Sequence, residues 1–389
     1  MTSPISGCVI LVAYIQWELR YVAYPTGIGM GRDDRANVGR DSVRTKKFVL
    51  RSLGLLMMAG AALPAVSQTK WDVVKTWHIG GEGAWDYLTV DAETHRLFVP
   101  RSTHTMIIDA GSGKVLGDIP GQKGAHGVAI VPSVGRGFIT DGGGTGAILI
   151  FDLKTYAVLG KLAAMPDADG IIYDAKLGRV LAVSGDGGAL MTFKPDIDPV
   201  AGKIDPPIAL GGKPEFLASD GSGKVYINLE DKDLVAEVDV PARKVLARWS
   251  VAPGGHPVGM AIDVKTHRLF VGCRNPQKMI VMSTEDGKIL ASLPIGAGVD
   301  ATKFDSGQAF ASCRDGSLAV IGETGGKFTI EETVKTTLGA RTMGVDPSTH
   351  KIYLPTADFE EAKPGAAAAR PKQKPDSFMI VEVGRSTVN

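Results

Sequence analysis

Seven positions along the chain bear the side chains best suited to binding or catalysis. Each directly precedes a short segment of small and apolar residues, and six of the seven are polar or charged. These positions are Asp86, His126, Asp169, Glu215, Val258, Asp300 and Arg341. Four carboxylates that converge with a histidine could hold a hard or borderline cation, and an arginine beside them could pair with an anionic group. The alternative is a hydrated rim closed by ordinary ion pairs, although positions chosen for packing alone would not need charge.

These positions can converge only if the segments after them are equivalent strands, and the chain repeats itself accordingly. The segment 91–99 (DAETHRLFV) returns as 263–271 (DVKTHRLFV) and as 346–354 (DPSTHKIYL). The copies begin 172 and 83 residues apart, close to four and two multiples of a unit of just over forty residues. In each copy the Asp and the turn residues after it suit a tight reversal, and the apolar triplet suits a strand.

Seven such units can be aligned, each with four short strands. The first strands are expected at 87–90, 127–130, 170–173, 216–219, 259–262, 301–304 and 342–345. The last unit ends after its third strand, 378–383, whereas 73–79 stands alone before the first unit and matches the fourth strand 245–251 in frame. We therefore expect an all-β fold, a seven-bladed β-propeller of four-stranded antiparallel blades, with the ring closed by an N-terminal strand that completes the last blade.

The chain resembles the YncE-like, YVTN-repeat family of seven-bladed β-propellers over residues 70–384. The reversals described above, hairpins such as 112–116 and 286–290, and the ending 378–384 carry the resemblance. It implies an exported protein, and it specifies the fold far better than the activity. Two segments depart from the pattern, at 194–207 and 358–376, and we expect the second to be a mobile surface excursion.

The N-terminal region carries a targeting pattern. A basic cluster at 44–47 with Arg51 precedes the apolar run 53–63, and small residues at Ala65 and Ser67 suit a signal peptidase. We expect a secretory signal peptide at 44–67, with an uncleaved anchor as the alternative, and a single propeller domain at 68–389. Residues 1–43 are interpreted as an over-long extension, with the true start at a later residue such as Met30. A periplasmic or secreted location without a transmembrane segment in the mature protein follows.

Composition narrows the classes of function. With 389 residues, 44% of them hydrophobic, and 49 Gly and 22 Pro, the chain suits a large core joined by many turns. Eight of the 43 Lys and Arg and four of the 42 Asp and Glu precede residue 69, which leaves 35 against 38, a balance of −3. That balance argues against nucleic-acid binding that is independent of sequence.

The remaining cysteines and histidines have local explanations. Three cysteines cannot build a disulfide scaffold, and Cys273 and Cys313 fall at matching places in neighbouring units. Equivalent positions on adjacent blades lie beyond the roughly 7 Å Cα separation that a disulfide spans, so we expect reduced thiols rather than a bridged pair or a soft-metal site. His256, two residues before Val258, is a further candidate for the channel mouth unless it only fixes its loop. The histidines that recur in the reversals are explained by turn and packing chemistry; they are His95, His267 and His350.

These observations favour an exported binding protein that uses the mouth of the central channel, or one propeller face, to hold a small ligand, a cation or a protein partner. Neither a Gly-x-Ser-x-Gly elbow nor a His-Glu-x-x-His motif is present. The alternative is a metal-assisted hydrolase of the lactonase kind, with His126 as general base. Its cation ligands would be Asp86, Asp169, Glu215 and Asp300. A third possibility is a subunit of a redox assembly, but without Cys-x-x-Cys-His any haem would belong to a partner. No cofactor is expected apart from a possible divalent cation.

Overall fold

The computed structural model describes residues 69–361 and 372–387. Within these residues the regular structure is β-strand, apart from one short 3-10 helix, η1 (Pro132–Val134). The expected extension at 1–43, the expected signal peptide at 44–67 and the middle of the 358–376 excursion lie outside the described residues. No helix among the described residues is long and apolar enough to cross a membrane.

Four of the sheets each take four consecutive strands in antiparallel order. The first holds β9 (Ala168–Asp174), β10 (Arg179–Ser184), β11 (Ala189–Phe193) and β12 (Ile208–Ala209). The second holds β13 (Pro214–Ser219), β14 (Lys224–Leu229), β15 (Leu234–Asp239) and β16 (Lys244–Ser250). The third holds β17 (Pro257–Asp263), β18 (Arg268–Arg274), β19 (Gln277–Ser283) and β20 (Ile289–Pro294). The fourth holds β21 (Val299–Asp305), β22 (Gln308–Cys313), β23 (Ser317–Thr324) and β24 (Lys327–Lys335).

A fifth four-stranded sheet joins the two ends of the described chain. It contains β25 (Gly344–Asp346), β26 (Lys351–Thr356), β27 (Met379–Thr387) and β1 (Thr69–His78). β1 forms the outer edge and pairs antiparallel with β27, with Val73 opposite Val383 and Trp77 opposite Ile380. The first strand of the described chain therefore adds the fourth strand to a sheet otherwise made from its last residues.

The sixth sheet has seven strands. These are β2 (Thr89–Asp91), β3 (Arg96–Pro100), β4 (Ser102–Asp109), β5 (Val115–Val131), β6 (Arg136–Asp141), β7 (Ala147–Asp152) and β8 (Val158–Ala163). The long strand β5 is shared, because its first half pairs with β4 and its second half with β6. Between the halves Gly121 has a φ of 93°, a conformation that glycine adopts without steric cost. One continuous strand can therefore change partners at this point.

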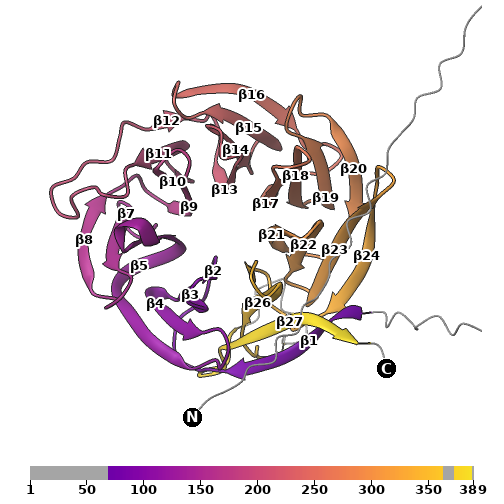
Figure 1. The fold of residues 1–389 in the computed structure, drawn as a ribbon, viewed down its shortest axis with the longest axis horizontal. Helices are drawn as coiled ribbons and strands as arrows, with labels where there is room; N and C mark the ends of the chain where they lie inside the picture. Colours follow the sequence, from indigo (N-terminus) through magenta and orange to yellow (C-terminus); the bar gives the residue numbers. More distant parts are fainter. Residues whose placement is uncertain (1–68, 362–371, 388–389) are drawn as a thin grey trace, which may run out of the picture. The chain divides into compact units, whose positions relative to one another are not determined.

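The sheets are arranged in a circle, with β2, β9, β13, β17 and β21 nearest the centre and β8, β16, β20, β24 and β1 at the periphery (Figure 1). Contacts between inner strands run from β5 through β9, β13, β17 and β21 to β25, and β25 contacts β2, which contacts β5. The inner strands are crowded, since a Cβ on Gly170 would lie 2.8 Å from the main-chain oxygen of Glu215. Small residues in the expected first strands are what this crowding requires.

The recurring reversals have the local chemistry that the sequence indicates. Asp263 accepts a hydrogen bond of 2.5 Å from the hydroxyl of Thr266, and Asp91 accepts one of 3.3 Å from the main-chain N–H of Thr94. The three recurring histidines all have positive φ, at 51°, 58° and 58°. Histidine is enriched in this left-handed conformation among residues other than glycine, so the turn itself explains why the histidine recurs.

The core lies between adjacent sheets and is built from their buried apolar side chains. Cys273 and Cys313 are fully buried, unpaired, and belong to different clusters of this core. Burial raises the pKa of each thiol to about 12, so both stay protonated at neutral pH. They act as small apolar fillers of the core.

The side chain of Trp71 anchors β1 to the neighbouring sheet. Its ring packs edge-on against Phe310 at 5.1 Å and donates a hydrogen bond to Gln308 in the neighbouring sheet. Trp71→Ala should lower the free energy of unfolding by about 3–5 kcal/mol, because a buried aromatic side chain and its contacts are lost.

Urea denaturation measures this effect. The matched control is Val74→Ala on the same strand, because Val74 is 44% exposed and its loss should change stability by less than about 0.5 kcal/mol. Equal effects of the two substitutions would show that β1 is not anchored through Trp71.

Candidate functional site

The inner strands carry the sequence-predicted residues at or near their starts. His126 lies in β5, Asp169 in β9, Glu215 in β13 and Asp300 in β21, each near the start of the segment that runs along the centre. Asp86 and Arg341 lie just before β2 and β25 in the same relation. Val258 is fully buried in the core and contributes no polar group. The polar residues fall into two groups with Glu215 between them.

The first group consists of Asp86, His126 and Asp169. The Nδ1 atom of His126 lies 2.7 Å from Asp86 Oδ2 and 3.6 Å from Asp169 Oδ1. One ligand atom from each of the three residues lies within 4.8 Å of the others. Asp169 is only 8% exposed, and its Oδ1 atom has no hydrogen-bond donor among the described residues. The group is therefore compact, and one buried acceptor in it is unsatisfied.

The electrostatics of this group show several acids crowded around one imidazole. Burial alone would lower the pKa of His126, but the hydrogen bond to Asp86 and the charges of Asp169 and Asp86 outweigh it and raise the pKa to about 9. Burial, followed by repulsion from Glu215, raises the pKa of Asp169 well above its usual range. The imidazole is thus a cation at neutral pH, and the crowding favours the protonated form of Asp169.

The second group is a closed ion-pair network around Asp300. This carboxylate is 4% exposed and accepts hydrogen bonds from the guanidinium groups of Arg274 and Arg341. Arg341 also donates to the main-chain oxygen of Trp85 at 3.0 Å, and Arg274 to that of Val299 at 3.0 Å. Asp300 and Arg341, both predicted at the mouth, therefore satisfy each other.

Glu215 lies between the two groups without a close partner. Its carboxyl makes no hydrogen bond or ion pair within 4 Å among the described residues. Burial, with the charges of Glu230 and Asp300, raises its pKa to about 8. Tyr87 is also affected, because burial and then the charges of Glu215, Asp300, Asp169 and Asp86 raise its pKa well above its usual range. All four predicted carboxylates therefore act on one point beside Tyr87.

His256 has a loop-fixing role as well as a charged neighbour. Its main-chain N–H donates to Asp233 at 2.6 Å, and its φ is 52°. Its Nε2 atom lies 3.3 Å from Glu230, the acid that helps to raise the pKa of Glu215. Lys213 lies 3.8 Å from the same glutamate. The main-chain oxygen of His256 also accepts a hydrogen bond of 3.1 Å from the main-chain N–H of Arg274, so His256 contacts the mouth residues through both Glu230 and Arg274.

Comparison with known proteins adds information about the fold. No family model and no curated protein matches the chain. Among solved structures, the WD40 repeats of RRP9 align with a TM-score of 0.67 at 11% identity, covering 82% of this chain and 100% of that one. U3-55K aligns with a TM-score of 0.64 at 11% identity, covering 80% and 99%. A hydrazine synthase chain of Kuenenia stuttgartiensis aligns with a TM-score of 0.60 at 12% identity, covering 72% and 94%.

The fold is that of a WD40-like β-propeller. At 11–12% identity the likeness shows the fold and carries no information about ligand or activity. The chemistry of this propeller must therefore be argued from its own channel.

Three residues of the site were missed by sequence reasoning. Glu230 directly follows β14 and Arg274 ends β18, so both lie at the end of a second strand. Among the residues near these strand ends, only the cysteines were considered as candidates in the sequence. Lys303 is the third residue of an expected first strand that was treated as small and apolar throughout. A charged residue at the end of a second strand, or inside a first strand that is otherwise small and apolar, was the signal that could have identified these three residues.

The pKa of Glu215 predicts how stability depends on pH. The folded-state pKa of about 8 exceeds the ordinary value of 4.5, so the native protein retains a proton that the unfolded chain releases. The free energy of unfolding should therefore fall as the pH rises from 5 to about 8. Glu215→Gln, which removes the charge and keeps the shape, should flatten this fall by roughly 2–4 kcal/mol.

Chemical denaturation of the full chain at several pH values, with a chelator present, measures the slope. Glu93→Gln in the first reversal is the control, because Glu93 is exposed. If Glu215→Gln retains the slope of the unmodified protein, Glu215 is not the group that holds the proton.

Proposed function

We propose that this propeller is an exported binding protein that holds a divalent cation, alone or as part of a small ligand, in the mouth of its channel. The observation that carries the proposal is the compact group of Asp86, His126 and Asp169, with its unsatisfied buried oxygen. Carboxylate oxygens with an imidazole nitrogen suit borderline and hard cations such as Zn²⁺ or Mn²⁺.

A bound cation would replace the protons that the crowded side chains hold. Leaving a buried acceptor without a donor costs about 1–3 kcal/mol, and Asp169 Oδ1 is such an acceptor. A divalent ion would satisfy this oxygen and Asp86, and would displace the proton that His126 otherwise carries. Three protein ligands leave further coordination positions open, which is what a site that also accepts a small ligand requires.

Asp300 belongs outside the cation site in this proposal. Two guanidinium groups already neutralise it, and moving it onto a cation would leave two partly buried arginines without this partner. The proposed ligands are therefore Asp86, Asp169 and His126 rather than the four carboxylates expected from the sequence. Glu215 lies nearby but is not one of the three.

A metal-assisted hydrolase is the second candidate. The bond of 2.7 Å between His126 and Asp86 is the arrangement in which a carboxylate orients a histidine base, and it favours this candidate. Against it, His126 belongs to the same compact group and would itself bind the cation in the proposed site, so it would not be free to act as general base. Binding therefore fits the geometry better than hydrolysis does.

We also infer that the ring has seven blades, closed by β1, as in the YncE-like group. In this interpretation the seven-stranded sheet is two blades that share β5, since its halves pair with β4 and β6 separately. The unbroken series of contacts between inner strands and the pairing of β1 with β27 support it. The repeated segments of just over forty residues support it as well.

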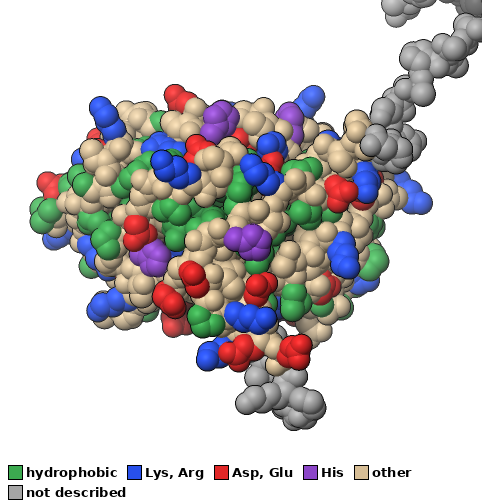
Figure 2. Space-filling model, turned by 90° about the horizontal axis from the view of Figure 1, so that it is seen from below, with side chains coloured by type: hydrophobic (Ala, Val, Ile, Leu, Met, Phe, Trp, Pro, Cys, Tyr) green, Lys and Arg blue, Asp and Glu red, His purple; other side chains and the backbone are tan. Residues whose placement is uncertain are grey.

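The proposals of export and of a small-molecule or protein partner are supported by the N-terminal sequence and by the surface charges. The basic cluster and apolar run at 44–67 support export to the periplasm or the exterior. Acidic and basic side chains are interspersed over the face shown in Figure 2, where no continuous basic tract is visible. This mixture supports a small molecule or a protein as partner rather than a nucleic-acid backbone.

Metal titration tests the proposed cation site. Chelator-treated full chain, titrated with Zn²⁺ and Mn²⁺ in a calorimeter, should bind one ion. Asp169→Asn should weaken this binding at least tenfold, because it removes a charged ligand from the centre of the group. Asp286→Asn, at an exposed hairpin, is the matched control and should bind like the unmodified protein.

Absence of binding, or equal affinity in the Asp169 variant, would exclude the site. The same samples separate the two candidate functions. Hydrolysis of lactones or esters by the metal-loaded protein, lost in His126→Gln, would favour the enzyme over the binding protein.

A further inference from the structure

Lys303 stands out among the residues that line the channel. It is the third residue of an expected first strand, and the equivalent residues of the other six units are uncharged. These residues are Thr89, Ala129, Ile172, Ala218, Ala261 and Gly344. A long cationic side chain therefore enters the channel from β21 at a level where the other strands present small or apolar groups.

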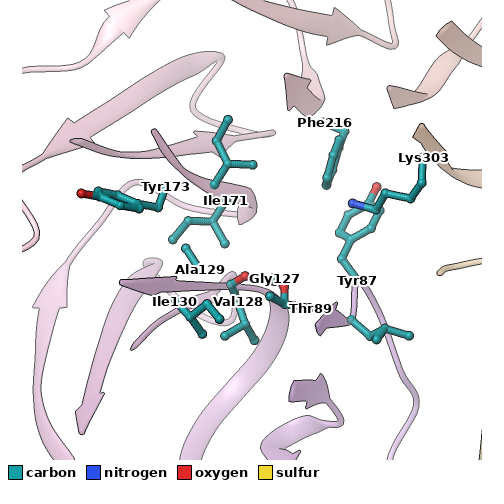
Figure 3. Close-up of a pocket in the computed structure, with 12 residues that line it drawn as sticks. Tyr87, Thr89, Gly127, Val128, Ala129, Ile130, Ile171, Tyr173, Phe216 and Lys303 are labelled. Atoms are coloured by element: carbon teal, nitrogen blue, oxygen red, sulfur yellow. Dashed lines mark hydrogen bonds between the residues drawn. The ribbon is translucent and has the colours of Figure 1, made fainter. Parts of the chain in front are cut away.

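The side chain lies on a cavity of about 260 Å³. Figure 3 shows Tyr87, Phe216 and Lys303 together on one side of this cavity and Ile171 on the other. The lining is largely apolar, with Lys303 as its one charged residue. A second cavity, of about 270 Å³, shares Thr89 and Lys303 with the first. The ammonium group thus borders an apolar space large enough for a small molecule.

The ammonium group has no counter-ion among the described residues. It makes no hydrogen bond or ion pair with them, and its nearest favourable contact is the Phe216 ring, with Nζ 5.1 Å from the centroid. Burial lowers the pKa of Lys303 to about 8, and no acid offsets this effect. The side chain is partly buried and the group is still mainly protonated at neutral pH, so a positive charge borders the apolar cavity without a counter-ion among the described residues.

We propose that the channel cavity is a second binding site, which takes a small monoanion with an apolar body, such as an aromatic or short-chain carboxylate. The carboxylate would pair with Lys303 Nζ, and the apolar body would pack against Tyr87, Phe216 and Ile171. An anion beside the amine would supply the counter-ion that the described residues do not provide. The cavity is smaller than the typical range of about 300–1,000 Å³ for ligand pockets, which limits the ligand to a few heavy atoms beyond a ring.

The proposal does not depend on the cation site at the mouth. It rests on different residues, and Lys303 lies three residues along β21 from Asp300. The competing explanation is that Lys303 only fills space, with its amine solvated by water in the channel. That explanation predicts no preference for an anion over a neutral molecule of the same shape.

Calorimetric titration of the chelator-treated full chain at pH 7 tests the proposal, with benzoate as probe and benzyl alcohol as its neutral counterpart. Benzoate should bind at least tenfold more tightly than benzyl alcohol. Lys303→Met, which keeps the length of the side chain, should abolish that preference. Lys265→Met, at an exposed lysine in a reversal, should preserve it. Equal binding of the two probes, or unchanged benzoate affinity in Lys303→Met, would overturn the proposal.

A second measurement needs no variant. Trinitrobenzenesulfonate labels unprotonated lysine amines, and mass spectrometry of the peptides quantifies the label at each site. Saturating benzoate should slow labelling of Lys303 at least fivefold and leave Lys265 unchanged. Equal labelling rates at Lys303 with and without benzoate would overturn the proposal even if Lys303→Met does not fold.

Discussion

The close approach of the inner strands is the constraint on which the rest of the structure depends. Where Gly170 passes Glu215, even a Cβ atom would lie 2.8 Å from the neighbouring main-chain oxygen. At this distance, residues at equivalent places in successive strands lie close together, and their charges act on one another. An acid at the mouth must therefore find a base within the ring, keep a proton or take a ligand.

Only the acid on the Asp300 side of the mouth is fully paired with bases. Around Asp300 two arginines complete the network and leave no acceptor for a ligand. On the other side the imidazolium of His126 faces Asp86 and Asp169, and among the described residues Asp169 Oδ1 has no donor and Glu215 has no partner within 4 Å. The asymmetry is the strongest reason to assign binding to the His126 side, because a rim serving only stability would have paired its acids evenly.

The sequence was sufficient for the periodic features and insufficient for the contacts. Alternation, reversals and repeats predicted an all-β chain of four-stranded sheets, because these depend on local pattern. The continuity of β5, which pairs with both β4 and β6 and contains Gly121 at a positive φ, was not predicted, because no sequence pattern marks it. The choice of Asp300 rather than Asp86 as the partner of Arg341 depends on side-chain positions at the ångström scale. Lys303 was missed because its neighbours satisfy the strand pattern without it.

The two proposed sites have opposite charge and lie in sequence along one channel. Tyr87 connects them, since it lines the cavity and also responds to the acids at the mouth. The acids at the mouth give an anion no attraction from that end, whereas a bound cation would attract it. Occupation of the mouth and of the cavity would thus favour each other without any movement of the strands. A small molecule that carries its own metal ion, with an anionic and an apolar part, would satisfy both sites at once.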